Sequence, residues 1–309
     1  MLTGQDLAQR WFRTATVITL AGALALSGCA KKTESSSGGS AGPTTSVIDV
    51  KPQKVDELAA GVPEDIRKSG KLIVGVTIPY TPNEFKDAQG KIVGFDVDVL
   101  DAVAATLGLT TEYRESDFAK IIPSIEGGTY NVGMSSFTDT KEREQQVDFV
   151  TYFSAGSQWA QRTGAGIDPN NACGKKVAAM AASTQQTDEL PAKSKACVNA
   201  GKPEIQIITF DGQDAVTNSV VLGQADAMSA DSPVTAWAIK QSNGKLEAAG
   251  AIFDSAPYGW PVKKGSPLAQ SLQKALEHII ATGDYKTIAT EWGVESGMID
   301  KPVINGAIS

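Results

Sequence analysis

Short apolar runs alternate with helix-patterned segments along most of this chain, and this alternation constrains the fold more than any other feature. Residues 72–76 form an apolar run between Gly70 and Pro79, which is typical of a buried strand. Residues 94–107 follow with apolar side chains at helical spacing, and Gly108 can end that helix in the left-handed conformation. Strands that alternate with helices predict parallel sheets of the α/β class.

The alternation occurs in two blocks, and the sequence therefore predicts two lobes. Further strands are predicted at 110–114, 131–134, 176–180, 205–210 and 227–230, and further helices at 121–126, 184–194, 214–222 and after Pro233. Residues 266–291 predict two more helices joined at Gly283-Asp284.

The first residues are typical of an export signal. Arg10 and Arg13 precede an apolar run at 15–26, which is too short to span a bilayer comfortably and suits a signal-peptide core. The run ends in Leu26-Ser27-Gly28-Cys29, which resembles a bacterial lipobox, whose cysteine becomes the lipid-bearing N-terminus. We therefore expect a lipoprotein signal peptide at 1–28 and lipidation of Cys29. The alternative is an ordinary signal peptide with a chance cysteine.

The segment after Cys29 is poor in apolar residues. Residues 33–46 are rich in Ser, Gly and Thr, a composition typical of a flexible linker. We expect residues 29–62 to tether the body to the membrane, which predicts an extracytoplasmic, lipid-anchored protein.

Three cysteines are an odd number, and a lipidated Cys29 leaves the pair Cys173 and Cys197. Exported proteins meet an oxidising compartment, so we expect this pair to form a disulfide. The alternative is two unpaired thiols.

Composition excludes several classes of function. The net charge of −7 argues against nucleic acid as a partner, because phosphate binding needs clustered Lys and Arg. The single histidine, His278, argues against multi-His metal sites and against Ser-His-Asp or Cys-His triads. We expect no cofactor, no metal and no catalytic residues.

Several segments stand out by their order and spacing. They are 72–76 with Tyr80-Thr81-Pro82, 94–98 with 104–108, 122–125 with 127–131, 140–143 with 147–149, and 223–227. Together they resemble the bacterial extracellular solute-binding proteins of family 3, which bind polar amino acids for ABC importers, and the resemblance covers roughly 65–295. Asn131 stands where the family more commonly has Asp.

The resemblance implies a two-lobed periplasmic-binding-protein fold of type II, with two parallel-type sheets joined by a two-strand hinge. Lobe 1 would comprise 63–157 plus 258–295, lobe 2 would comprise 158–257 with the hinge crossovers, and 296–309 would be a tail. Such a hinge allows the lobes to close around a ligand. Open α/β sheets place ligands beyond the carboxyl ends of their strands.

The resemblance also implies the residues that bind the ligand carboxylate. Arg143 matches the family's carboxylate-binding arginine, and a guanidinium can meet a carboxylate with two hydrogen bonds. Ser136 and Thr138 match its accessory positions, and Ser183 and Thr184 supply hydroxyl and N–H groups from lobe 2. The alternatives are a solvated helix charge for Arg143 and simple N-capping for the Ser183-Thr184 pair.

The amine and the side chain of the ligand have their own candidates. Asp231 matches the family's amine-binding aspartate, with an N-cap before Pro233 as the alternative. Tyr80 and Phe118 match positions where the family packs rings around the ligand side chain, with plain core packing as the alternative. Trp159 is a further cleft candidate beside the first crossover, with packing at the hinge as the alternative.

Two positions bear on the charge of the ligand. Relatives that select cationic amino acids often carry an acid where Thr77 stands, which favours an uncharged polar or acidic ligand here. Glu84 lies near the cleft mouth in the same register and can still serve a cation.

The expected function is a monomeric amino-acid receptor that closes around its ligand and docks on an ABC permease. One alternative is a periplasmic dehydratase on the same fold, similar to cyclohexadienyl dehydratase, with Glu84 as its nearest candidate acid. Another is a sensory receptor for a signalling partner.

Overall fold

The computed structural model describes residues 50–308. The expected signal peptide, the lipidation site Cys29 and residues 29–49 of the expected tether lie outside the described residues. Within residues 50–308, no helix is both long enough and apolar enough to cross a membrane.

One mixed sheet of eight strands runs through the whole body, in the order β4-β1-β5-β10-β6-β9-β7-β8. At one end β1 pairs in parallel with β4 and β5, and at the other end β7 pairs in parallel with β8 and β9. The strands are β1 (Lys71–Val76), β4 (Thr110–Glu115), β5 (Val132–Gly133), β6 (Val147–Arg162), β7 (Lys176–Met180), β8 (Gln206–Phe210), β9 (Ala227–Asp231) and β10 (Leu246–Lys263). The α/β class is confirmed, but the two expected sheets are continuous because β6 and β10 belong to both.

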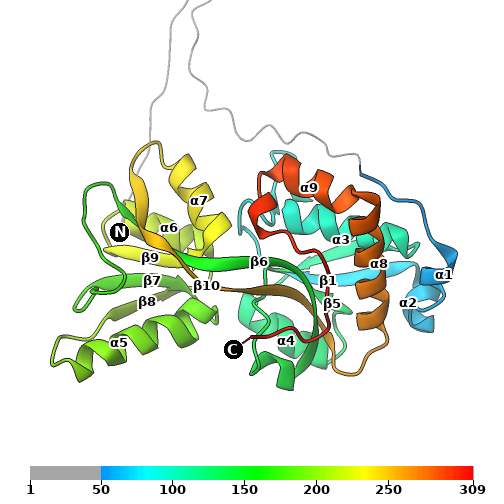
Figure 1. The fold of residues 1–309 in the computed structure, drawn as a ribbon, viewed down its shortest axis with the longest axis horizontal. Coiled ribbons are helices and arrows are strands. Elements are labelled where there is room, and N and C mark those ends of the chain that lie inside the picture. Colours follow the sequence, from blue (N-terminus) through cyan, green and yellow to red (C-terminus); the bar gives the residue numbers. More distant parts are fainter. Residues whose placement is uncertain (1–49, 309) are drawn as a thin grey trace, which may run out of the picture. The chain divides into compact units, whose positions relative to one another are not determined.

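Helices cover both faces of the sheet in each half (Figure 1). Around β1 lie α2 (Glu64–Ser69), α3 (Phe95–Thr106), α4 (Phe118–Glu126), α8 (Leu268–Thr282) and α9 (Asp284–Trp292). Around β7 lie α5 (Leu190–Asn199), α6 (Gln213–Val221) and α7 (Ser232–Gln241). A small hairpin of β2 (Phe85–Lys86) and β3 (Ile92–Val93) completes the first half. After α3, Gly108 adopts a φ of 70°, as expected from its place at the helix end.

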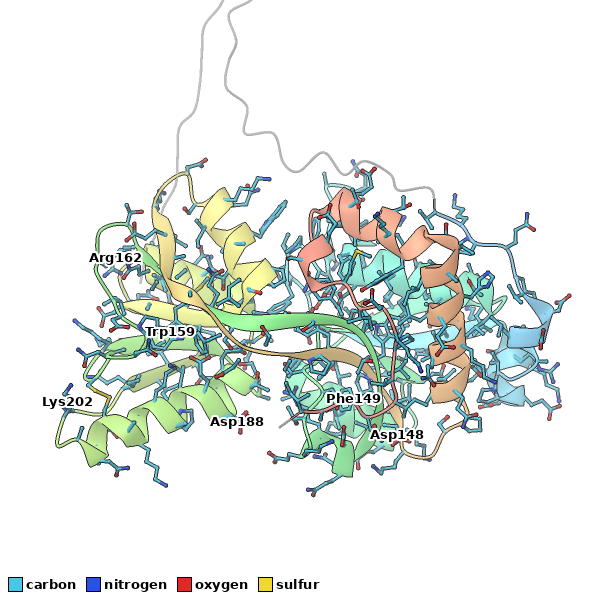
Figure 2. The ribbon with its side chains drawn as sticks, viewed as in Figure 1. Asp148, Phe149, Trp159, Arg162, Asp188 and Lys202 are labelled. Atoms are coloured by element: carbon cyan, nitrogen blue, oxygen red, sulfur yellow. A yellow bond between two sulfur atoms is a disulfide. The ribbon has the colours of Figure 1, made fainter. Side chains whose placement is uncertain are left out.

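The strands β6 and β10 form the antiparallel ribbon that connects the halves. Figure 2 shows Asp148 and Phe149 at one end of β6 and Trp159 and Arg162 at the other. The register of the ribbon shifts twice between Ala249 and Ala256, so the backbone pairing is irregular at mid-length. The expected lobe boundaries at 157 and 257 fall inside this ribbon, and they stay a prediction.

Both ends of the described chain belong to the body, in contrast to the expected tether and tail. Residues 56–59 form the short helix α1 (Asp56–Ala59), and Ala59 and Val62 are buried. The boundary differs because these apolar side chains bury against the first half, where Val62 joins its hydrophobic core. At the other end Ile304 bridges to Val150, and Asn305 N–H donates to Phe149 O.

A disulfide joins Cys173 to Cys197, with a Cα–Cα distance of 5.5 Å, as the sequence predicts. It connects the segment before β7 to the C-terminal part of α5. The bond therefore constrains one edge of the second half of the body.

Candidate functional site

One small cavity between the two halves brings together every predicted ligand-binding residue. Its lining comprises Tyr80, Phe118, Ser135, Ser136, Thr138, Arg143, Met180, Ser183, Thr184, Gln185 and Asp231. The space open to the centre of a water molecule there is about 10 Å³. The side chains therefore nearly close the cavity, and an amino acid needs the two walls to separate or several side chains to turn away.

The cavity lies at the carboxyl ends of parallel strands, as α/β folds favour. Ser135 follows β5 closely, Ser183 follows β7, and Asp231 is the last residue of β9. Two residues at this edge have left-handed backbone that is uncommon outside glycine, with φ of 51° at Ser136 and 60° at Ala182. Such conformations concentrate at functional sites, and the sequence carries no signal for them.

Asp231 is buried, and side chains from both halves of the body donate hydrogen bonds to its carboxylate. Tyr80 Oη donates to its Oδ2 at 2.7 Å, and Gln185 Nε2 donates to its Oδ1 at 2.8 Å. Burial raises the pKa of Asp231, and these two donors partly oppose that rise. Its carboxylate makes no capping bond to α7, so the alternative of a simple N-cap is not what the structure shows.

Arg143 opens a short 3-10 turn, η1 (Arg143–Gln145), and turns its guanidinium into the site. Nη1 donates to Thr138 O at 2.8 Å, and Nη2 reaches the other half to donate to Ala182 O at 2.9 Å. The guanidinium carbon lies 5.5 Å from the ring centre of Phe118 and 5.6 Å from that of Phe137. Hydrogen bonds therefore fix the Arg143 guanidinium at the wall of the cavity, and Arg143 is not the solvated helix charge that was the alternative.

The predicted serine and threonine residues differ in the hydrogen bonds that they make. Ser183 Oγ donates to Met180 O at 2.7 Å and accepts from Gln186 N–H at 3.3 Å, so the capping alternative describes its hydroxyl well. Thr184 precedes the π-helical turn η2 (Gln185–Glu189) and makes no side-chain cap bond. Thr138 contributes its carbonyl to Arg143.

The predicted aromatic residues separate into two groups. Phe118 stacks on Phe137 with ring centres 4.2 Å apart and planes 16° apart, and it therefore serves both the core and the cavity. Tyr80 lines the cavity with its hydroxyl on Asp231. Trp159, by contrast, is fully buried in the second half, where Nε1 donates to Glu189 Oε1 at 2.6 Å, and it does not line this cavity.

Two features of the site were missed or misplaced by the sequence. Gln185, which holds Asp231, carries no motif that marks it. Glu84, expected near the cleft mouth, has an exposed fraction of 0% and lies behind Ser135, whose Oγ donates to Glu84 Oε1 at 3.0 Å. Its neighbour Asp96 is equally buried.

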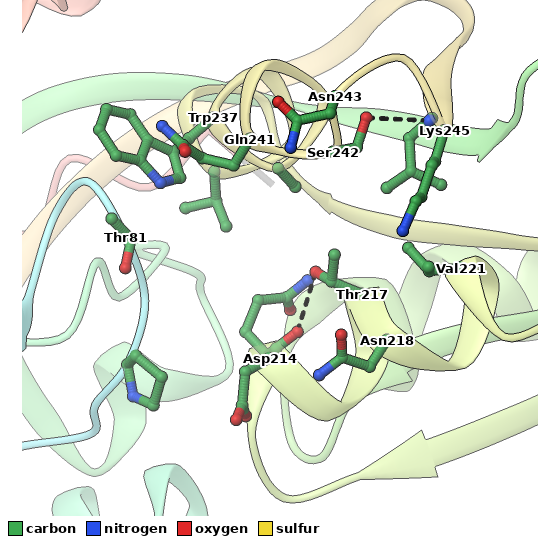
Figure 3. A pocket seen from close by; sticks show the side chains of 15 residues that line it. Thr81, Asp214, Thr217, Asn218, Val221, Trp237, Gln241, Ser242, Asn243 and Lys245 are labelled. Atoms are coloured by element: carbon green, nitrogen blue, oxygen red, sulfur yellow. Dashed lines mark hydrogen bonds between the residues drawn. The ribbon is translucent and has the colours of Figure 1, made fainter. Parts of the chain in front are cut away.

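A roomier pocket lies between α6 and α7 and is distinct from this site (Figure 3). It has a volume of about 360 Å³, and Asp214, Trp237 and Lys245 line it together with Thr81 from the first half. None of the predicted ligand-binding residues lines it. Residues 50–308 hold no cluster of three or more His, Cys, Asp or Glu side chains suited to a metal ion.

Comparison with known proteins identifies the family. The sequence profile of the bacterial extracellular solute-binding proteins, family 3, matches residues 72–295. The chain belongs to this family. As its description states, the family is extracellular, and the chain is therefore an extracytoplasmic protein.

Individual proteins extend this result. The Arginine-binding protein ArgT from Corynebacterium glutamicum is 40% identical over 256 residues, which cover 82% of this chain and 84% of the relative. The ABC transporter glutamine-binding protein GlnH from Bacillus subtilis is 28% identical over 250 residues, with 78% and 86% covered. A solved structure of an ancestral arginine-binding protein bound to arginine has a TM-score of 0.67 and 34% identity, and the match covers 72% of this chain and 98% of that one.

Proposed function

We propose that this protein is the amino-acid-binding component of an ABC importer, and that it closes its two halves around a free amino acid with a cationic side chain, arginine first. One observation carries the proposal: a held arginine, Arg143, and a buried aspartate, Asp231, line a single cavity and come from opposite halves of the body. A free α-amino acid presents a carboxylate and an ammonium group, and a dry cleft must match both because unpaired buried charge is costly.

The contacts within the cavity suggest how the ligand takes its place. The ligand carboxylate replaces the carbonyls of Thr138 and Ala182 as the partner of Arg143, because a carboxylate accepts stronger, charge-assisted hydrogen bonds from a guanidinium. The ligand ammonium replaces the Tyr80 hydroxyl at Asp231 Oδ2. Each exchange substitutes a charged partner for a neutral one, so the liganded site has both of its charges paired.

The names of two similar proteins run against the expected preference for an uncharged polar or acidic amino acid. Both the 40% identical relative and the structural neighbour are arginine-binding proteins by name. The preference rested on the absence of an acid at Thr77, whereas the structure places Glu84 and Asp96 directly behind the Ser135-Ser136 wall. This buried negative charge supports a cationic ligand side chain seated against that wall.

The catalytic alternative lacks support from the site. Its candidate acid, Glu84, does not line the cavity. The relatives ArgT and GlnH are binding proteins by name. We further propose that Cys29 carries the lipid anchor and that the protein works as a monomer beside its permease.

Isothermal titration tests the proposal. The purified protein is titrated with arginine, glutamine and glutamate, and we expect saturable binding of arginine with an affinity well above that of the other two. Arg143→Ala should weaken arginine binding until the titration no longer detects it. Absence of binding for all three amino acids would overturn the proposal.

A further inference from the structure

Two buried carboxyl groups lie directly behind the cavity wall. Glu84 and Asp96 both have an exposed fraction of 0%. Ser135 Oγ donates to Glu84 Oε1 at 3.0 Å, and Ser136 donates from its backbone N–H and its Oγ to Asp96 Oδ2 at 3.1 and 2.9 Å. Ser135 and Ser136 also line the cavity, so each of them lies between the cavity and a carboxyl group.

The two carboxyl groups lie near enough to each other for the charge of one to act on the other. Burial and then the neighbouring charge of Asp96 raise the pKa of Glu84 well above its ordinary value. Burial also raises the pKa of Asp96 to about 6, against the opposing effect of donors from Tyr152 and Ser136. The pair therefore retains a proton more strongly than two separate acids would, and the larger rise in pKa favours Glu84 as its carrier.

The groups that face the pair are hydroxyls and acids. Tyr80 and Asp231 act on Glu84 from the cavity side, Tyr152 on β6 donates to Asp96 Oδ2 at 2.5 Å, and Tyr285 on α9 faces Asp96. Beyond Tyr152 lies Tyr258 on β10, with ring centres 6.1 Å apart. None of the groups that most strongly shift the pKa values of Glu84 and Asp96 is positively charged.

Two oxygens beside the pair have unused capacity to accept hydrogen bonds. Among the described residues, Asp96 Oδ1 and Asn83 Oδ1 are buried and receive no hydrogen bond from an N–H or hydroxyl group. Asn83 is fixed at this place because its Nδ2 donates to Ser136 Oγ at 2.8 Å. Buried acceptors without donors are costly, and a guanidinium or ammonium group supplies donors and positive charge together.

We propose that the Glu84–Asp96 pair is a specificity-determining element that reads the charge of the ligand side chain. A cationic side chain seated against Ser135 and Ser136 displaces this proton: the O–H bond of Glu84 breaks, the proton passes to the solvent, and two carboxylates behind the serines then balance the charge of the ligand. A neutral side chain leaves the proton in place. The inference rests on the proposed amino-acid binding and adds a proton that leaves only when the ligand is cationic.

The test compares arginine with citrulline, in which a neutral urea group replaces the guanidinium. The full chain is titrated calorimetrically at pH 7 in phosphate and in Tris, two buffers with different heats of ionisation, and the difference in binding heat counts the protons released. We expect about one proton for arginine and none for citrulline. Arginine binding without proton release overturns the inference and leaves the proposed function standing. Failure of both ligands to bind overturns the proposed function itself.

The variant Glu84→Gln removes the titrating group at nearly constant shape. We expect arginine to release almost no proton from it, and the ratio of arginine to citrulline affinity to fall by at least about tenfold. Glu126→Gln, an exposed acid at the end of α4, is the matched control and should leave both quantities unchanged. Proton release that persists in Glu84→Gln contradicts the assignment.

The wild-type protein provides a second measurement that does not depend on the folding of a variant. Because binding of arginine releases a proton, its affinity relative to citrulline should rise with pH, by up to about tenfold per pH unit between pH 5 and pH 8. Titration of Asp231 affects both ligands alike and cancels in this ratio. A ratio that does not change with pH overturns the inference.

Discussion

Tyr80 and Asp231 are joined across the two halves of the body by a 2.7 Å hydrogen bond from the phenol to Oδ2 of the carboxylate. The carboxylate is buried, and the second oxygen is held by Gln185. Since the ligand ammonium is proposed to take the place of the phenol, the bond holds the site shut and is exchanged when the ligand enters.

The first prediction concerns the charge of Asp231. Asp231→Asn should weaken arginine binding about 100-fold, because the ammonium loses a buried ionic partner. Tyr80→Phe should bind arginine at least as tightly as the wild type, because the competing hydroxyl is gone. Asp226→Asn removes a half-buried charge from the same half, outside the cavity, and should leave affinity unchanged. Titration calorimetry measures all three, and tight binding by Asp231→Asn contradicts the assigned role.

The second prediction uses two arginines that are held in similar ways. Arg143 donates to Thr138 O and Ala182 O, and Arg162 donates to Val220 O and Ala225 O. Arg143→Lys should reduce arginine affinity about 30-fold or more, because lysine loses the two-pronged geometry. Arg162→Lys should instead cost about 1–3 kcal/mol of unfolding free energy with little change in affinity. Equal effects of both variants on affinity would count against Arg143 as a ligand-binding group.

The third prediction concerns the disulfide, which closes a loop with a sequence separation of 24. Replacing Cys173 and Cys197 together by serine should lower the free energy of unfolding by about 3 kcal/mol, because the unfolded chain regains loop entropy. Urea denaturation of the wild type and of the double variant measures the difference. Arginine affinity should be unchanged, since neither cysteine lines the cavity.

The fourth prediction is a dependence of stability on pH. Burial raises the pKa of Asp98 from 3.8 to about 6, partly opposed by the Trp292 N–H that donates to its Oδ2 at 2.8 Å. The folded protein therefore binds this proton more tightly than the unfolded chain. Its contribution to stability is present below about pH 4 and is lost as the pH rises to about 6, on the order of 3 kcal/mol.

Urea denaturation between pH 4 and pH 8 isolates this contribution. Asp98→Asn has no such proton, so its stability relative to the wild type should increase across the same range of pH. Asp65→Asn, at an exposed position in α2, is the control for the loss of one charge. A difference between Asp98→Asn and the wild type that is constant with pH would refute the prediction.

The sequence predicts those parts of the fold that are encoded locally. The strand at 72–76 and the helix at 94–107 agree closely with β1 and α3, because their apolar spacing and the glycine at 108 decide both. The long strands β6 and β10 were not predicted, because an 18-residue strand that serves two halves has no repeating pattern of burial along it. The tether was placed too far along the chain, because Ala59 and Val62 are buried through contacts with distant segments.

The candidate site, too, was predictable where the signal is local and not where it depends on contacts between distant segments. The residues carried over from the family resemblance all line one cavity, because their places after strand ends fix them at one edge of the sheet. Gln185 carried no signal, because its contact with Asp231 arises only when segments far apart in the chain fold together, and Glu84 was expected near the cleft mouth, whereas it is buried beside Asp96. The expected ligand preference rested on Thr77, with Glu84 noted as a group that can serve a cation, and the burial of Glu84 and Asp96 behind Ser135 and Ser136 was not predicted.

The ribbon of β6 and β10 has one further consequence. Its ladder shifts twice between Ala249 and Ala256 and once more between Tyr258 and Gly259, and Gly156 permits an approach so close that a Cβ would lie 2.6 Å from Phe253 O. The proposed closure of the halves would bend the ribbon where its pairing is irregular, and the distance between the halves would then follow the occupancy of the site. Two fluorophores, one on each half, would therefore convert occupancy into a single optical signal, and the protein is a natural scaffold for a reagentless amino-acid sensor.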